Sequence, residues 1–186
     1  QAATGHLTPV HAKALQNLSS QWTHSPLGLN WDTPEGTHVS RSQALAEFAK
    51  QLHDLGYITG WRNEKFSYWE DHVIGTGQQC LEPTALLPAA FEMERSAFRF
   101  FGLRSHAVHV NGFTREGHVW CGRRALTKPT DPGMLDNVAA GGLPAGESLK
   151  TCAIREMAEE AGIAEALALS AVSHGKVSTC RSVANG

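Results

Sequence analysis

Three glutamates crowd one short segment and could do chemistry together. Glu156, Glu159 and Glu160 lie between Ser148, a residue type that commonly caps helix N-termini, and Gly162, a common helix stop. Residues three and four apart lie on one face of a helix, so the pattern predicts that the three carboxylates project from the same side. Oxygen ligands in a tight group suit a hard cation such as Mg²⁺ or Mn²⁺ better than zinc.

A second interpretation of this segment is an acidic helix face that is simply solvated. Like charges at these spacings repel by about 0.2–0.5 kcal/mol per pair, so a helix retains them most readily where a cation neutralises them. On another side of the helix, apolar residues recur at the spacing that predicts a core contact, namely Ala153, Ile154, Met157 and Ala161. The residue types alone leave both interpretations open.

The residues that precede the glutamates predict the strands that must position them. Residues 106–113 and 118–124 predict two strands of a hairpin, joined by a turn at residues 115–117. Residues 135–140 predict a third strand that leads into Gly141. A strand end, a glycine loop and an acidic helix suit a metal–diphosphate site, because the sheet fixes a backbone carbonyl opposite the carboxylates.

Residues 1–104 predict a small α+β unit before this region, with residues 1–40 rich in loop-forming residue types. Its second helix should begin at Ser40, end at Gly56 and bury a stripe that includes Leu45 and Phe48. The other expected elements are helices at 11–20 and 89–101, short strands within 57–69 around a turn at 63–65, and loops at 25–36 and 75–83. Trp61, Phe91, Phe98 and Phe101 are expected in its core.

Length and composition exclude several classes of protein. The 186 residues suffice for one ample domain or two small ones. Hydrophobic residues make up 41% and charged residues 18%, which is typical of a globular chain. A net charge of −2 argues against nucleic acid or a membrane surface as partner. No apolar run approaches the roughly 20 residues of a membrane span.

The sequence predicts a cytoplasmic protein. The N-terminal residues lack the basic segment and apolar core of a secretory signal, while the missing initiator Met is compatible with a removed targeting segment. No two cysteines form a C-x-x-C pair. We therefore expect reduced thiols at Cys80, Cys121, Cys152 and Cys180.

The segment from Gly141 to Ile163 resembles the Nudix box, G-x5-E-x7-R-E-U-x-E-E-x-G-U, in which U is a bulky aliphatic residue. Nine constrained positions at fixed spacing make this a specific pattern. Every defined position is filled, by Gly141, Glu147, Arg155, Glu156, Met157, Glu159, Glu160, Gly162 and Ile163. The resemblance implies a Nudix hydrolase, which cleaves a diphosphate linked to a variable group and holds a divalent metal in a loop-helix-loop.

The resemblance also implies which residues hold the metal. Glu156 and Glu160 would be the main ligands of Mg²⁺ or Mn²⁺, and Glu159 would complete the acidic cluster. The backbone carbonyl of Ala140 would be a further ligand. The implied fold is α+β, with a Nudix-type α/β/α sandwich whose mixed sheet carries the loop-helix-loop box.

Two further groups of charged residues have candidate roles. By the resemblance, Arg155 and Glu147 would form an ion pair that orients the catalytic loop. Independently of it, Arg123, Arg124 and Lys128 lie between the hairpin and the third strand and are candidates for binding substrate phosphates. Ordinary surface charge is the alternative for these three. For Trp120, core packing is favoured over stacking on a substrate ring.

Residues 106–142 are similar to one Nudix branch, related to the Nudix domain that is fused to thiamine pyrophosphokinase in some fungi. The shared runs are HVNG, W-x-x-RR, a lysine, PG-x-LDN and AGG, together with WRNE-F and ERSAFRFFG in an N-terminal domain of unassigned function. This similarity implies hydrolysis of thiamine diphosphate, or of its oxidised or damaged analogues, to the monophosphate.

A complete Nudix domain continues with further strands and a second large helix, whereas 23 residues follow Ile163 here. We therefore expect residues 105–186 to form a Nudix domain that lacks its C-terminal part. Three hypotheses remain: a metal-dependent diphosphatase acting on a small molecule, a Nudix-like module that binds a diphosphate ligand without turnover, and an acidic helix without metal. The sequence leaves a homo-oligomer open.

Overall fold

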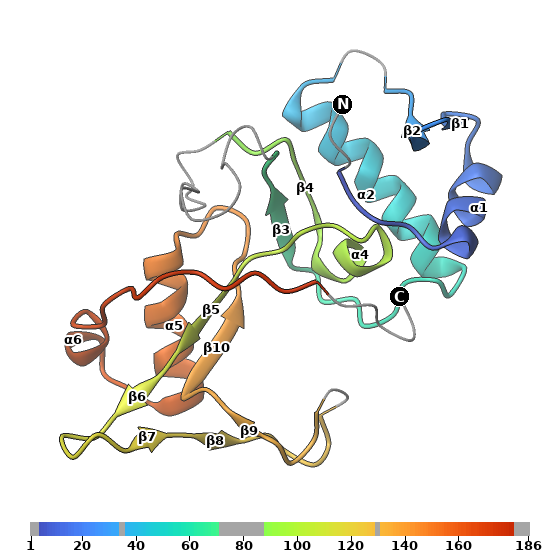
Figure 1. Ribbon diagram of the computed structural model, residues 1–186. Coiled ribbons are helices and arrows are strands. Elements are labelled where there is room, and N and C mark those ends of the chain that lie inside the picture. The colour runs from blue at the N-terminus through green and yellow to red at the C-terminus, as the bar shows by residue number, and fades with distance from the viewer. Residues whose placement is uncertain (1–3, 34–35, 71–87, 129–130, 181–186) are drawn as a thin grey trace. The chain divides into compact units, whose positions relative to one another are not determined.

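The computed structural model describes residues 4–33, 36–70, 88–128 and 131–180. Its helices and strands are of the mixed α+β class that the sequence predicts (Figure 1). Within the described residues, no helix is both long and apolar enough to cross a membrane.

Contacts divide the chain into two compact units. Unit 1 contains the chain up to Ser105, with residues 144–146 and the C-terminal stretch from Val177, and unit 2 contains residues 106–143 and 147–176. We keep the two-domain organisation, with its boundary at residues 104–105, as a proposal.

Unit 1 begins with a helix whose start is set by a threonine cap. Helix α1, Pro9–Leu18, follows Thr8, whose hydroxyl accepts a hydrogen bond from the N–H of His11 at 3.2 Å. A proline in the first turn has no N–H to lose there. The predicted helix at residues 11–20 is confirmed, but its predicted start was two residues late because Thr8 was not recognised as the cap.

The long helix of unit 1, α2, spans His38–Asp54 and is capped by Thr37. It therefore also begins two residues before the predicted start at Ser40. Gly56 follows its end with φ of 80°, a conformation that favours glycine. The predicted stripe is confirmed, since the buried residues of α2 are Leu45, Phe48, Ala49 and Leu52.

A hairpin occupies part of the stretch that we expected to be a loop. Strands β1, Trp22–Ser25, and β2, Gly28–Trp31, pair in antiparallel register, so the predicted loop at 25–36 was wrong for residue 25 and for residues 28–31. Trp22 lies opposite Trp31, and their rings stack with centroids 5.6 Å apart. The Pro-Leu-Gly turn residues therefore mark a tight connection rather than a long loop.

A second correction concerns residues 89–101, which form strand β4, Phe91–Glu94, followed by the short helix α4, Arg95–Phe100. Strand β4 pairs antiparallel with β3, Lys65–Tyr68, and the rings of Tyr68 and Phe91 stack at 5.0 Å. Strand β3 confirms one of the short strands predicted within 57–69, but residues 57–64 form no strand, so the strand predicted before the turn was wrong. The partner of β3 comes from a distant part of the sequence, which local patterns do not reveal.

An aromatic core holds unit 1 together. Phe91, Phe98 and Phe101 are buried as predicted, and Trp61 is half-buried and packs against the same cluster. The predicted loop at 75–83 lies outside the described residues.

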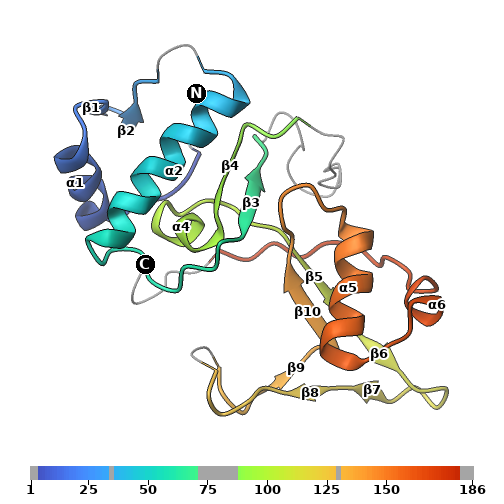
Figure 2. The ribbon, with the colours of Figure 1, turned by 180° about the vertical axis from the view of Figure 1, so that it is seen from behind.

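Within its described residues, unit 2 contains six short strands that pair two by two, all antiparallel. The predicted hairpin is confirmed by the pairing of β6 with β7, although each predicted strand is interrupted, at Asn111 and at Cys121. Figure 2 shows β6 to β9 continuing as a narrow ribbon from the β5–β10 pair. The strands are β5 (Ala107–Val110), β6 (Gly112–Phe113), β7 (Val119–Trp120), β8 (Gly122–Arg123), β9 (Leu135–Asp136) and β10 (Ala139–Gly142).

Helix α5, Leu149–Ala161, packs on the β5–β10 pair, with the cap at Ser148 and the stop at Gly162 that the sequence predicts (Figure 1). Met157 and Ala139 form the centre of this small core, with Ala153 and Ile154 packed against it. Ala161 is exposed, which corrects its predicted place in the core, because it lies in the last turn beyond the strands. The four-residue helix α6, Glu165–Ala168, follows.

Candidate active site

Arg155 joins the loop before α5 to the acidic face of the helix. Its Nε and Nη2 donate to the two carboxylate oxygens of Glu147, at 3.1 and 3.0 Å. Its Nη1 donates to Glu156 at 2.7 Å and to Glu159 at 3.2 Å. The bidentate hydrogen bonds to Glu147, more than any other contact, raise the pKa of Arg155 above its ordinary value. Arg155 and Glu147 thus form the ion pair implied by the Nudix resemblance.

Glu156 places its carboxylate against the glycine at which the box begins. A Cβ atom at Gly141 would overlap the carboxylate of Glu156. The same carboxylate is mostly buried, since its side chain is 12% exposed. A glycine at this strand position therefore leaves the space in which a carboxylate from the facing helix lies.

Glu160 reaches the neighbouring residue of the same strand. Its Oε2 accepts a hydrogen bond from the N–H of Ala140 at 2.9 Å. In the register of β10 with β5, Ala140 lies opposite His109, and its N–H bonds to Glu160 rather than to β5. In a strand the N–H and C=O of one residue point to the same side, so the Ala140 carbonyl lies on the same free edge of β10.

The third glutamate, Glu159, lies further out. Its side chain is 60% exposed and contacts Arg155. Within the described residues, no group of three or more His, Cys, Asp or Glu side chains is gathered closely enough to hold a metal ion. The described geometry thus brings Glu156 and Glu160 to adjacent residues of β10 and leaves Glu159 at the rim.

The donor set fits a hard divalent cation. Glu156, Glu160 and the Ala140 carbonyl are all oxygen donors beside residues 140–141 of β10, as Mg²⁺ and Mn²⁺ prefer. Arg155 contacts three of the four box carboxylates, those of Glu147, Glu156 and Glu159. Its guanidinium carries one positive charge, so negative charge remains for a cation to neutralise. Because Gly141 has no Cβ atom, a carboxylate can approach the backbone at this position.

Cys152 is a buried residue of this region that the sequence pattern did not reveal. Its side chain is fully buried, and its Sγ lies 3.4 Å from the carbonyl oxygen of Gly142. Burial, reinforced by the nearby charge of Glu147, raises the pKa of Cys152 to about 12. The sequence holds one signal for this position. Cys152 is a small residue one turn before Glu156, and small residues are common where a helix packs closely on a strand. Cys121 and Cys180 are free thiols, as expected, and Cys80 lies outside the described residues.

The candidate phosphate-binding cations have different surroundings. Arg124 forms an ion pair with Asp136 at 2.5 Å, and this hydrogen bond lowers the pKa of Asp136. Arg123 donates to the carbonyl of Gly133 at 2.9 Å, while Lys128 is exposed. Both arginines therefore contact other residues of the β8–β9 hairpin. Each would keep that contact beside any contact with a substrate phosphate.

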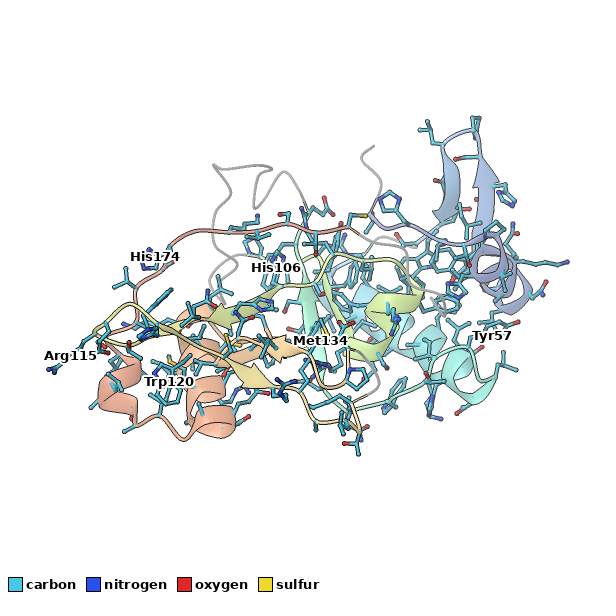
Figure 3. The ribbon with its side chains drawn as sticks, turned by 60° about the horizontal axis from the view of Figure 1, so that its bottom comes forward. Tyr57, His106, Arg115, Trp120, Met134 and His174 are labelled. Carbon is cyan, nitrogen blue, oxygen red and sulfur yellow. The ribbon has the colours of Figure 1, made fainter. Side chains whose placement is uncertain are left out.

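Trp120 corrects an expectation, because it is 62% exposed instead of packed in the core. Strand β7 is only two residues long, and the described part of the chain leaves most of Trp120 uncovered. The ring borders an open groove of about 250 Å³, which we call the Trp120 groove, lined by Asn111, Trp120, Cys121, Leu135, Asp136 and Asn137. In Figure 3, Arg115, Trp120 and Met134 follow one another along the ribbon that carries this groove.

The site consists of the acidic helix α5, the glycine-containing strand β10 and the loop that Arg155 holds through Glu147. Residues 103–182 match the family model described as NUDIX domain.

Curated relatives extend the similarity beyond that domain. The chain is 39% identical over 183 residues to Nudix hydrolase 24, chloroplastic, of Arabidopsis thaliana, covering 94% of this chain and 46% of the relative. It is 40% identical over 141 residues to Nudix hydrolase 20, chloroplastic, of the same plant, covering 74% of this chain and 34% of the relative. An uncharacterized protein of Saccharomyces cerevisiae is 28% identical over 131 residues, 66% of this chain and 34% of that protein. The chain thus spans less than half the length of these relatives.

Proposed function

We propose that this chain carries the metal-dependent catalytic part of a Nudix hydrolase that cleaves a diphosphate linkage in a small molecule. The observation that supports this most directly is the convergence of Glu156 and Glu160 on the adjacent residues Gly141 and Ala140. The names of both Arabidopsis relatives describe them as Nudix hydrolases, which supports the same reaction class.

Each box residue has a definite part in this proposal. Glu156, Glu160 and the carbonyl of Ala140 hold Mg²⁺ or Mn²⁺, and Glu159 at the rim completes the acidic cluster. When bound, the metal neutralises diphosphate charge and lowers the pKa of water. Arg155 keeps Glu156 aligned while its bidentate bonds to Glu147 fix the preceding loop. A box carboxylate, or one outside the box, takes the proton from the attacking water.

The substrate and the location are finer proposals. The similarity of residues 106–142 to the thiamine pyrophosphokinase-related branch supports thiamine diphosphate, or its oxidised or damaged analogues, as the substrate, with the monophosphate as product. Arg123, Arg124 and Lys128 are the proposed phosphate-binding residues. Neither nucleic acid nor a membrane is a proposed partner, and a homo-oligomer stays open. A cytoplasmic location stays a prediction, and the names of both Arabidopsis relatives carry the word chloroplastic.

The decisive experiment measures Mg²⁺-dependent release of phosphate or monophosphate products from a panel of diphosphates. The panel contains thiamine diphosphate, its oxidised forms, nucleotide sugars and dinucleotides. Glu156→Gln and Glu160→Gln should each lower turnover by about two orders of magnitude or more while the thermal midpoint changes little. Glu165→Gln, an exposed glutamate on α6, is the matched control and should keep wild-type turnover. Near-normal turnover of Glu156→Gln would remove the assignment.

The alternative is a Nudix-like module that binds a diphosphate ligand without cleaving it. Calorimetric titration with Mg²⁺ and a diphosphate separates the two, because the module would bind both and release no product. A chain that binds neither metal nor diphosphate would instead carry only an acidic surface helix.

A further inference from the structure

The Trp120 groove combines an open aromatic face with fixed polar groups. The ring of Trp120 is 62% exposed, and the other residues that line the groove are two asparagines, an aspartate, a cysteine and a leucine, namely Asn111, Asn137, Asp136, Cys121 and Leu135. Exposed tryptophan rings beside ordered polar groups are typical of sites that bind planar ligands.

Hydrogen bonds within unit 2 fix the amide side of the groove. The Asn137 amide nitrogen donates to Asn111 Oδ1 at 2.6 Å, and Asn137 Oδ1 accepts from His109 Nδ1 at 2.8 Å. Because the oxygen of Asn111 is used in this way, its NH₂ group is oriented away from Asn137. Among the described residues this NH₂ group has no hydrogen-bond partner. Because Asn111 lines the groove, this NH₂ group is a donor that a ligand there can use.

Asp136 supplies an acceptor to the same groove. Its Oδ2 accepts from Arg124 at 2.5 Å, and its Oδ1 accepts from the N–H of Asn137 at 2.9 Å. An ionised carboxylate has about four lone-pair sites, so about two remain for a ligand. The arginine beside it keeps the carboxylate ionised at neutral pH, since it lowers the pKa of Asp136.

We infer that the Trp120 groove binds a planar heteroaromatic ring that carries a hydrogen-bond donor and an acceptor side by side on one edge. The ring stacks on Trp120, its acceptor faces the Asn111 NH₂, and its donor faces Asp136. An amino group next to a ring nitrogen satisfies this pattern, and so does a lactam N–H next to its carbonyl. A ring without such an edge leaves the NH₂ of Asn111 and the carboxylate of Asp136 without new partners.

The position of the groove connects it to the candidate active site. Asn137 precedes Ala140 by three residues, a separation of about 10 Å in extended chain. His109 contacts Asn137 and lies opposite Ala140 in the strand register. A sugar or a short carbon chain between a ring in the groove and a diphosphate at Ala140 spans such a distance. This inference deepens the proposed hydrolysis and rests on it for the orientation of the substrate.

The test measures binding of nucleoside monophosphates to the whole chain, without metal and without a bond to cleave. Tryptophan fluorescence follows titration with AMP, IMP and purine riboside 5′-monophosphate, which lacks the substituted edge. AMP and IMP carry the donor and the acceptor in opposite order, so a groove with one fixed donor and one fixed acceptor should bind one of the two about tenfold more tightly than purine riboside 5′-monophosphate. Equal binding of all three would overturn the edge recognition, and no binding of any would overturn the site. Failure here leaves the hydrolysis assay unaffected, so the two proposals fail separately.

Variants separate the groove from general surface binding, with isothermal calorimetry as the readout because one removes a fluorophore. Trp120→Ala should weaken AMP binding by about tenfold or more, and Trp120→Phe should largely restore it. Phe113→Ala removes another exposed aromatic of the same hairpin, 66% exposed and outside the groove lining, and should not change AMP binding. Asn111→Asp keeps the acceptor for Asn137 but removes the donor, so whichever of AMP and IMP the wild type prefers should then bind no better than purine riboside 5′-monophosphate. Unchanged preference in Asn111→Asp would overturn the role of Asn111.

Discussion

The carboxylate of Glu156 occupies the space beside Gly141 in which any other residue would carry its Cβ atom. This glycine is not in the left-handed backbone region, so its role here is steric rather than conformational. Gly141→Ala should displace Glu156 from the strand and lower Mg²⁺-dependent turnover by at least tenfold, with only a small loss of thermal stability.

The matched control for that change is a strand glycine with room for a methyl group. Gly112→Ala, in β6 of the same unit, would place its Cβ 3.4 Å from Trp120, an ordinary contact. Turnover and thermal midpoint of this variant should stay near wild type. If Gly141→Ala kept full turnover as well, the close approach of Glu156 to β10 would have no catalytic importance.

The ion pair between Arg155 and Glu147 should contribute measurably to stability, because it is bidentate and partly shielded. The side chains are 32% and 16% exposed. A double-mutant cycle with Arg155→Lys and Glu147→Gln, followed by urea denaturation, should give a coupling free energy of about 1–2 kcal/mol. Turnover should fall in both single variants because the loop before α5 loses its anchor.

An exposed ion pair of the same chain provides the comparison. Lys50 and Asp54 pair one turn apart on α2, and both side chains are 59% exposed. The same cycle with alanine at these positions should give only about 0.3–0.5 kcal/mol. Equal coupling in the two cycles would mean that Arg155 and Glu147 have no special role in holding the loop.

Local patterns in the sequence predicted α5 and the arrangement of its box residues. Ser148 and Gly162 mark its ends, and the spacing of the glutamates predicted that they project from one face of the helix, opposite the end of the preceding strand. Both the cap bonds and the i, i+4 geometry are local, so they follow from a few neighbouring residues. The pairing of Arg155 with Glu147 was implied only by the family resemblance, because eight residues and a loop separate them.

Elements that depend on distant partners were not predicted from the sequence. Residues 91–94 were expected in a helix, but they pair with β3, which precedes them by more than 20 residues. The exposure of Trp120 likewise depends on whether another element packs over β7. The spacing of apolar residues does not show this. Tertiary pairing thus overrode local propensity at these positions.

Glu94 should be one of the most sensitive positions of unit 1, because its carboxylate is buried and satisfies several donors. The residue is 6% exposed and accepts hydrogen bonds from the N–H groups of Arg62 and Glu64 and from the N–H and hydroxyl of Ser96. Glu94→Ala leaves these donors without an acceptor and should cost about 2–4 kcal/mol in urea denaturation. Glu92→Ala, two residues earlier on β4 and 30% exposed, should cost less than about 1 kcal/mol. Similar losses for both variants would contradict the role of Glu94.

Cys152 should give the protein a characteristic response to alkaline pH. Its pKa is about 12 in the folded chain against an ordinary value of 9.0, so the unfolded chain loses this proton first as pH rises. The stabilising contribution of the neutral thiol is complete below about pH 9 and is lost progressively up to about pH 12. Denaturation of Cys152→Ala should therefore depend less on pH in that window than denaturation of the wild type, although the variant is less stable at pH 7.

At pH 8, peptide mapping after brief treatment with a thiol reagent should find label on the exposed Cys121 and Cys180, and on Cys152 only after denaturation. Rapid labelling of Cys152 in the folded protein would show that α5 does not pack on β10 as described, and would remove the support on which Glu156 and Glu160 depend.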